Sequence, residues 1–244
     1  MAIPLTTRFI QVFSSPGKLF SGLGEDGAKD PPQTGWWLPL LITTLLGIGL
    51  SILLFGKVDF VAAMEEVLSA NPKIPAGQVD KIAEVAAKWS RAIAFAGGII
   101  GPAVAYFGYA VYWWLVVNLF KKPLNYMTTL SLYAWTDLIH LPGMILAAVA
   151  VVRAESFTSF KELMALSPGS PLFFMGDLSG VSIELATLLS KFDLFSIAHI
   201  AYIALGISAL TGLSKTRALL MGYAPWLLVS VAPAAIKFLL ASHS

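Results

Sequence analysis

Long apolar segments alternate with polar connections along the whole chain. A helix needs about 20 apolar residues to cross the roughly 30 Å hydrocarbon layer of a membrane. The segments that meet this length are expected near residues 36–56, 92–120, 127–152, 194–213 and 218–240. The pattern therefore predicts an all-α integral membrane protein, in which residues 1–244 form a single domain built as a bundle of five transmembrane helices.

Three segments outside these spans contain apolar residues at helical spacing. The long connection 57–91 is expected to form a pair of amphipathic helices, and the long connection 153–193 contains one more interfacial helix, within residues 171–192. In the N-terminal segment 1–35, four apolar residues surround Pro16: Phe9, Val12, Phe13 and Phe20. This arrangement predicts a kinked element that lies in the membrane interface.

Basic residues predict the orientation, because Lys and Arg resist translocation across the membrane. The basic residues of the two short connections, which contain no acidic residue, are Lys121, Lys122, Lys215 and Arg217. In the long connections 57–91 and 153–193, acidic residues balance the basic ones. The short connections and the N-terminus are therefore expected in the cytoplasm, and the long connections and the C-terminus outside.

The composition supports a membrane protein. Apolar residues make up 57% of the chain and charged residues 12%, against about 25% charged in soluble domains. The net charge of +2 comes from dispersed basic residues, which argues against a nucleic-acid partner. The absence of cysteine excludes disulfides and thiolate metal sites.

Small residues spaced by four predict where spans pack, because they let helix backbones come close in lipid. The candidate packing residues are Gly97 and Gly101 in the second span, and Ala204, Ser208 and Gly212 in the fourth. Prolines inside the spans free backbone carbonyls, which neighbouring groups must satisfy. We therefore expect kinked helices.

A polar centre interrupts the third span. Asp137 and His140 are three residues apart, and Tyr133 lies on the same helix face one turn before Asp137. At 1.5 Å per residue, this face lies roughly 15 to 20 Å from each end of the span. An Asp at that depth costs about 2.5 to 3.5 kcal/mol, so it is expected to face protein or water. Pro142 also removes the donor to the carbonyl of Leu138 and is expected to loosen the helix there.

The polar centre has several interpretations, which remain open. Asp137 and His140 satisfy each other or hold the third span to a neighbour, or they form a proton or cation relay, or they contact an unseen ligand. A metal site shared with His199 is not expected: His199 is counted roughly 8 Å below the outer surface and His140 roughly 18 Å. Zinc ligands, by contrast, lie about 2 Å from one ion.

The chain contains no HExxH, GxSxG or phosphate-binding glycine motif. We therefore predict no catalytic residues, no metal, no cofactor and no enzymatic activity. An intramembrane hydrolase is the least favoured function.

Several stretches together resemble the Yip domain family, the Ypt/Rab-interacting integral membrane proteins. FSSPGKLFSGL (13–23) is similar to the family's Phe-x-x-Pro-x-x-x-Phe element, and WWLP (36–39) leads into the first span as in that family. KKPLNYMTTLSLYAW (121–135) resembles the loop between its spans. Residues 191–219, which begin KFDLF, resemble its Asp-Leu-Phe entry to the fourth span.

The resemblance implies a five-span membrane protein with a cytoplasmic N-terminus. Eukaryotic members are associated with Rab GTPases and vesicle traffic through a long cytosolic N-terminal region, whereas the segment before the first span is short here. GTPase binding is therefore not expected. The chain is instead expected to be a prokaryotic member of the family in the plasma membrane. The family supplies no catalytic residues.

We therefore predict a non-enzymatic subunit that organises the membrane or binds a partner. Its partners are membrane lipids and either another protein or further copies of itself. The docking surface is expected to be the N-terminal segment with the short basic connections. The alternative is a small transporter or channel that uses Asp137 and His140, and an apolar groove for a lipid-like ligand is compatible with both.

Overall fold

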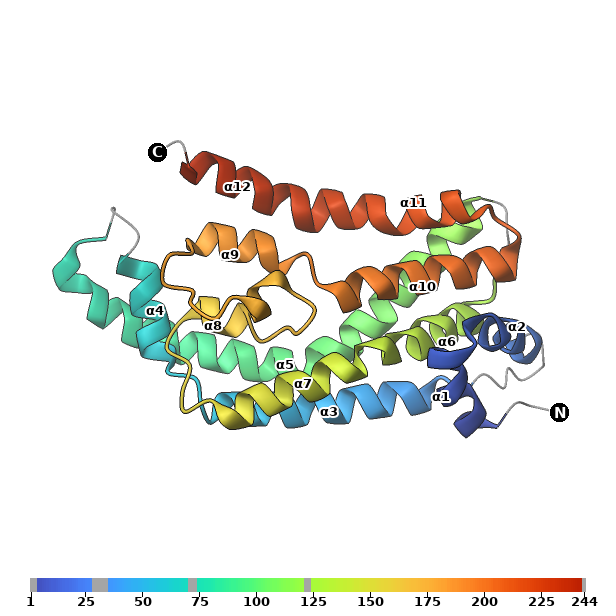
Figure 1. Cartoon of the computed structure of the whole chain (residues 1–244), viewed down its shortest axis with the longest axis horizontal. Coiled ribbons are helices and arrows are strands. Elements are labelled where there is room, and N and C mark those ends of the chain that lie inside the picture. Colours follow the sequence, from blue (N-terminus) through green and yellow to red (C-terminus); the bar gives the residue numbers. More distant parts are fainter. Residues whose placement is uncertain (1–3, 28–34, 70–73, 121–123, 243–244) are drawn as a thin grey trace. The chain divides into compact units, whose positions relative to one another are not determined.

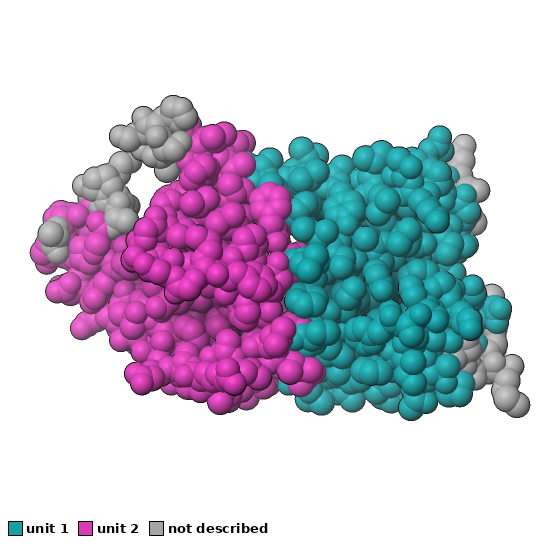
Figure 2. Space-filling view, viewed as in Figure 1, with its two compact units in different colours: residues 1–45, 103–142, 194–233 teal, residues 46–102, 143–193, 234–244 magenta. Residues whose placement is uncertain are grey.

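The computed structural model describes residues 4–27, 35–69, 74–120 and 124–242, which are mainly helical (Figure 1). Contacts divide the chain into two compact units, coloured separately in Figure 2. Unit 1 contains residues 1–45, 103–142 and 194–233. Unit 2 contains residues 46–102, 143–193 and 234–244.

The helices fall into three groups. The N-terminal pair is α1 (Leu5–Ser14) and α2 (Pro16–Gly27). The long apolar elements are α3 (Trp37–Phe55), α5 (Val79–Leu119), α6 (Tyr126–Asp137), η2 (Leu138–His140), α7 (Leu141–Arg153), α10 (Leu194–Thr211), α11 (Lys215–Trp226), η4 (Leu227–Val231) and α12 (Ala232–Ser242). The shorter elements of the connections are α4 (Phe60–Ser69), η1 (Ala76–Gln78), α8 (Phe160–Met164), η3 (Pro171–Phe174) and α9 (Ile183–Ser190).

Four helical stretches are long and apolar enough to cross a membrane, judged by length and composition. They are Trp37–Phe55, Tyr126–Arg153, Ile183–Thr211 and Lys215–Leu240. The segments Val79–Gly98 and Ala103–Leu119 are bent relative to each other, and they give a fifth candidate span if they are counted together as one. The described residues are thus all-α, with four candidate spans, or five if the bent pair counts as one span.

Two boundaries differ from those predicted. The second amphipathic helix of the connection 57–91 is not separate, because α5 begins at Val79 and continues into the predicted second span. The interfacial helix predicted within 171–192 is divided into η3 and α9. Moreover, the candidate span that contains the predicted fourth span begins at Ile183, the first residue of α9.

The N-terminal pair bends at Pro16, as predicted. α1 ends at Ser14, and α2 begins at Pro16 and packs against α6 and α10 (Figure 1). Apolar side chains of the pair are buried in unit 1: Val12, Leu19, Phe20 and Leu23. The buried guanidinium of Arg8 donates to the carboxylate of Asp26 and so joins α1 to α2.

Close helix contacts in unit 1 occur at glycines other than those predicted. A Cβ atom added at Gly206 of α10 would lie 2.4 Å from Cδ1 of Leu132 in α6. A Cβ added at Gly222 of α11 would lie 2.6 Å from Ile200 and 2.9 Å from Trp113. These glycines allow backbones to approach to a distance that a methyl group would prevent.

The predicted packing residues behave differently from one another. Among the described residues, a Cβ at Gly97 or Gly101 would meet no atom within 4 Å, so the prediction of close contacts there is wrong for that part of the chain. Gly212 has a φ of 71° just after the end of α10, where it serves the turn, and a Cβ added there would meet no described atom within 4 Å. Ala204 is fully buried, and the Ser208 hydroxyl donates to the carbonyl of Leu213 at 2.7 Å.

A proline in α11 shows how a freed carbonyl is satisfied. Pro225 has no N–H for the carbonyl of Met221, four residues earlier. The hydroxyl of Tyr112 in α5 donates to this carbonyl at 2.7 Å. This contact confirms the prediction that neighbouring groups must satisfy such carbonyls.

Unit 2 has its own apolar core. Val58 pairs with Phe157 in an isolated β-bridge, and both side chains are buried together with Phe60, Ala87 and Val151. The side chain of Lys57 donates to the carbonyls of Val152 and Ala154. The first residues of the two long connections are thus joined within one cluster.

Candidate functional site: an Asp–His–His cluster

Asp137 and His140 lie side by side because the third span changes its helical geometry there. Pro142 cannot donate to the carbonyl of Leu138, which instead accepts from the N–H of Leu141 in the 3₁₀ turn η2. Side chains three residues apart eclipse one another in this geometry. Nδ1 of His140 lies 3.2 Å from Oδ1 of Asp137 and 3.1 Å from the Asp137 carbonyl. The predicted loosening at Pro142 is confirmed.

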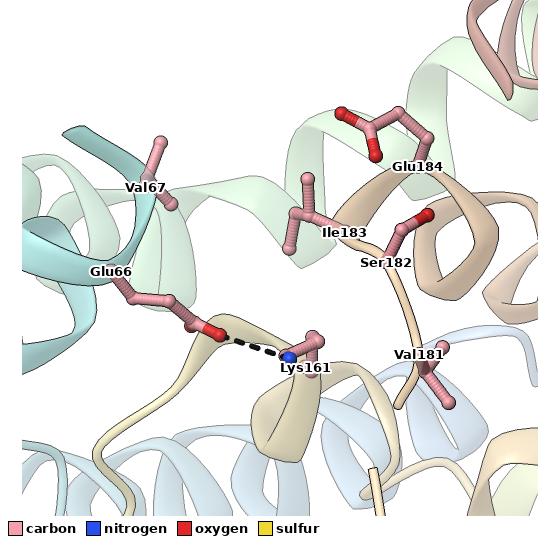
Figure 3. A pocket seen from close by; sticks show the side chains of 7 residues that line it. All are labelled: Glu66, Val67, Lys161, Val181, Ser182, Ile183 and Glu184. Atoms are coloured by element: carbon pink, nitrogen blue, oxygen red, sulfur yellow. Dashed lines mark ion pairs between the residues drawn. The ribbon is translucent and has the colours of Figure 1, made fainter. Parts of the chain in front are cut away.

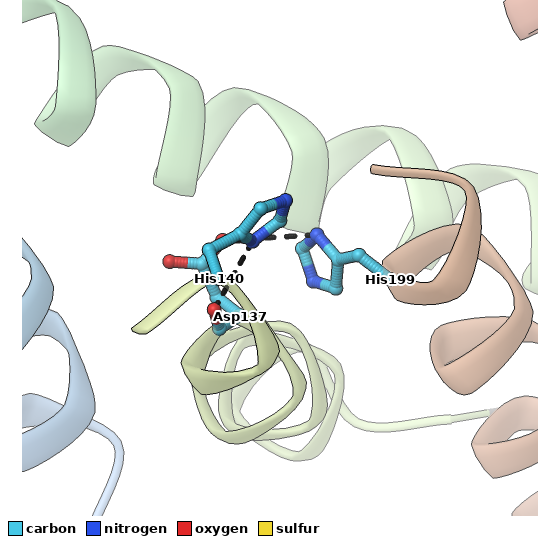
Figure 4. Close-up of side chains that lie close together, drawn as sticks. All are labelled: Asp137, His140 and His199. Atoms are coloured by element: carbon cyan, nitrogen blue, oxygen red, sulfur yellow. Dashed lines mark hydrogen bonds and ion pairs between the residues drawn. The ribbon is translucent and has the colours of Figure 1, made fainter. Parts of the chain in front are cut away.

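His199 of α10 completes the cluster (Figure 4). Its Nδ1 lies 3.7 Å from Oδ1 of Asp137, and its ring meets that of His140 edge-on with centroids 5.0 Å apart. The ligand atoms of Asp137, His140 and His199 all lie within 4.8 Å of one another. The prediction that His199 lies too far from His140 to share a site is therefore wrong.

The second carboxylate oxygen of Asp137, Oδ2, accepts a hydrogen bond from another helix. The hydroxyl of Tyr106 in α5 donates to Oδ2 at 2.6 Å, and the hydroxyl of Thr43 in α3 lies 2.8 Å from the Tyr106 oxygen. A phenol has a single proton, so Thr43 is the donor in the second bond. The chain Thr43 to Tyr106 to Asp137 thus fixes one side of the carboxylate.

The tautomer of neutral His199 follows from its other nitrogen. Nε2 lies 3.2 Å from the hydroxyl oxygen of Thr136. The Thr136 hydroxyl donates its proton to backbone carbonyls of its own helix, at 2.7 Å to that of Leu132 and 3.0 Å to that of Tyr133. Its oxygen is therefore the acceptor toward Nε2. Nε2 is therefore the N–H donor, and Nδ1 presents its lone pair to Asp137.

Tyr133 lies beside the cluster and contacts it through its aromatic ring. The ring lies 5.0 Å from that of His199 and 5.1 Å from that of Tyr106, and it stacks on Tyr109 at 5.7 Å. All these distances join ring centroids. Tyr133 therefore forms an aromatic wall beside His199, and no polar contact of its hydroxyl with Asp137 is observed.

Burial decreases from His199 to His140. The side chain of His199 is buried, that of Asp137 is 16% exposed and that of His140 is 27% exposed. Tyr106, Thr43 and Thr136 are buried around them. The cluster is thus bonded on its inner side and accessible from the side of His140.

The basic residues predicted to form a docking surface are not members of this cluster. Lys215 and Arg217 are exposed at the start of α11, which the hydroxyl of Ser214 caps by accepting from the N–H of Arg217 at 3.4 Å. Lys121 and Lys122 lie outside the described residues.

Sequence analysis missed three residues of the hydrogen-bond network around Asp137 and His199, and it rejected His199 as a member of the site. Tyr106, Thr43 and Thr136 have no unusual sequence context, because such residues are common in apolar helices. His199 did have a signal: it is an ionisable residue inside an apolar span, like Asp137 itself.

A separate cavity of about 310 Å³ lies in unit 2 (Figure 3). Glu66 and Lys161 point toward each other there and form an ion pair of 3.2 Å. The Glu66 carboxylate also accepts from Ser159, and the Lys161 ammonium donates to the carbonyl of Leu178. Because these charges satisfy one another, the cavity is a weaker candidate site than the cluster at Asp137.

Comparison with known proteins identifies a family. A family model described as the Yip1 domain matches residues 10–236, which include every residue of the cluster. No curated protein and no solved structure matches the chain.

Proposed function

Because the chain belongs to the Yip1 domain family, we propose that it is a non-enzymatic membrane protein that binds a partner or organises the membrane through its N-terminal helices. The proposed orientation places these helices in the cytoplasm and the C-terminus outside, in a prokaryotic plasma membrane. Lys215 and Arg217 would then face the same compartment as α1 and α2.

The observation that supports this function is the fixed position of α1. A buried ion pair is costly to desolvate, and removing one partner strands the other charge. Burial lowers the pKa of the Arg8 guanidinium, and the charge of Asp26 opposes that shift. The pair between Arg8 and Asp26 therefore stabilises α1 in one place relative to α2.

The fixed helix presents an outward apolar pair. Val12 faces the core of unit 1, whereas Ile10 is 62% exposed and Phe13 is 47% exposed. α1 is not one of the candidate spans, so these side chains are not accounted for by a transmembrane position. Apolar residues on such a helix are typical of a surface that contacts a partner or inserts into the membrane interface.

Transport through Asp137 and His140 is not favoured. Oδ2 of Asp137 accepts from Tyr106, and both histidines face Oδ1. A group bonded in this way is more typical of a binding or structural site than of a conduction path, in which bonds must be exchanged continually.

Photo-crosslinking tests partner binding directly. A photoreactive phenylalanine analogue replaces Phe13 in the full chain, and native membranes are irradiated. The control position is Leu45 of α3, which is apolar and 60% exposed. We expect a discrete adduct with a protein, or with a second copy of the chain, from position 13 and not from position 45. Lipid adducts alone at both positions would contradict partner binding at this surface.

A further inference from the structure

We infer that Asp137, His140 and His199 form a binding site for one divalent transition metal ion, for which Zn²⁺ is the best-suited species. This inference is independent of the docking surface on α1, since it concerns residues inside the candidate spans Tyr126–Arg153 and Ile183–Thr211. It rests on distances, on the donor set and on the bonds that orient the ligands.

The ligand atoms are already spaced almost as a metal ion requires. Zinc binds imidazole nitrogen and carboxylate oxygen at about 2.1 Å, so two ligands of a tetrahedral site lie about 3.4 Å apart. The Nδ1 atoms of His140 and His199 lie 3.2 Å and 3.7 Å from Oδ1 of Asp137. No two of the three ligand atoms are separated by more than 4.8 Å. Side-chain adjustments from 4.8 Å to about 3.4 Å complete the site.

A lone pair faces the carboxylate in the absence of an ion. Nε2 of His199 donates to Thr136, so Nδ1 of the neutral ring is an acceptor, as is Oδ1 of Asp137. Two acceptors that face each other across 3.7 Å repel, and a cation between them removes the conflict. Nδ1 of His140 lies beside the same oxygen and becomes a ligand when it releases its proton, as metal binding requires.

The donor set indicates the class of ion. Two imidazoles and one carboxylate suit zinc and other first-row transition metals, whereas calcium and magnesium prefer oxygen ligands throughout. Three protein ligands leave a fourth position for water or another ligand. His140, whose side chain is 27% exposed, marks the side from which an ion reaches the site.

Hydrogen bonds from neighbouring residues orient two of the ligands. Tyr106 holds Oδ2 of Asp137, and Thr136 holds Nε2 of His199, so Oδ1 and Nδ1 are left to face the ion. Such outer hydrogen bonds fix the tautomer and direction of ligands in known metal sites, and their loss weakens affinity by about 10- to 100-fold. Tyr106 is thus a positioning residue of the proposed site.

The test is a metal titration of the full-length, untagged protein in detergent after removal of metal with a chelator. Co²⁺ serves as the spectroscopic probe, and Zn²⁺ binding is measured by calorimetry. We expect one ion per chain, with visible Co²⁺ absorption of a four- or five-coordinate site. His199→Gln and Asp137→Asn should weaken binding by about 100-fold or more, and Tyr106→Phe by about 10-fold with all ligands retained.

His243, the third histidine in the sequence, supplies the control. His243→Ala should leave affinity and absorption unchanged. The inference is overturned if the unmodified folded protein binds neither ion, if His199→Gln binds as tightly as the unmodified chain, or if His243→Ala abolishes binding. The titration of the unmodified chain decides the question even if a variant fails to fold.

Discussion

Nδ1 of His199 lies 3.7 Å from Oδ1 of Asp137, although the two residues belong to different helices, α10 and α6. The contact makes Asp137 the centre of a network that includes residues from α3, α5, η2 and α10. An acidic residue inside an apolar span thus faces polar groups of several helices instead of lipid, where a charge is costly.

Close packing of α10 against α6 predicts the effect of a methyl group at Gly206. Gly206→Ala places Cβ 2.4 Å from Cδ1 of the buried Leu132, so the side chain of Leu132 or the helix must shift. We expect a loss of about 1 to 3 kcal/mol in the free energy of unfolding, measured by denaturant titration in mixed micelles. Gly97→Ala, where Cβ meets no atom within 4 Å, should be neutral or slightly stabilising. Equal losses at both positions would contradict the packing described.

The carbonyl freed by Pro225 predicts unequal effects for two tyrosines. Tyr112→Phe leaves the Met221 carbonyl without its donor and should cost about 1 to 3 kcal/mol of unfolding free energy. The matched control is Tyr223→Phe, because Tyr223 donates at 2.7 Å to the carbonyl of Ile197, which also accepts within α10. The control should cost less, about 0.5 to 1.5 kcal/mol. Thermal unfolding of both variants in one detergent measures the difference.

The sequence predicted the long helices well because their apolar length is a direct physical requirement of the membrane. It also predicted the break at Pro16 and the irregular turn before Pro142, since each follows from the missing N–H and the fixed φ of proline. The continuity of α5 from Val79 into the second span was missed, because a span boundary was placed where charged residues begin. Charges end a hydrophobic segment, but they do not end a helix.

The position of His199 was missed for a related reason. Its depth was counted from Leu194, whereas the candidate span that contains it begins at Ile183. Depth counted from a hydropathy boundary is only as accurate as that boundary. Tyr106 and Thr43 could not have been paired with Asp137, because contacts between distant helices depend on packing that periodicity does not encode.

The ion pair between Arg8 and Asp26 predicts a local effect on α1. Arg8→Met removes the cation that faces the buried Asp26 carboxylate, at a cost of about 3 to 5 kcal/mol. Amides of α1 should therefore exchange hydrogen faster, by roughly two orders of magnitude or more. The double variant Arg8→Met/Asp26→Leu should recover much of the protection, because the buried carboxylate that Arg8 neutralises is then also removed. The control is Lys18→Met, at an exposed position of α2, which should leave the exchange of the α1 amides unchanged. If the α1 amides exchanged as fast in Lys18→Met as in Arg8→Met, the prediction would be contradicted.

The proposed orientation can be tested by cysteine labelling, because the chain contains no cysteine of its own. Lys215→Cys should be protected from a membrane-impermeant maleimide applied to intact cells, and Glu84→Cys should be labelled. Both positions are exposed in the folded protein, so a difference reports the side of the membrane. Labelling of Lys215→Cys in intact cells with protection of Glu84→Cys would reverse the orientation.

X-ray absorption at the zinc edge tests the role of the Asp–His–His cluster most directly. The full-length protein is loaded with one equivalent of Zn²⁺ in detergent, and the spectrum reports the ligands around the ion. We predict nitrogen and oxygen ligands at about 2.0 to 2.1 Å, together with the outer-shell scattering of two imidazole rings. A shell of oxygen ligands without imidazole scattering would show that His140 and His199 do not bind the ion, and would contradict the site.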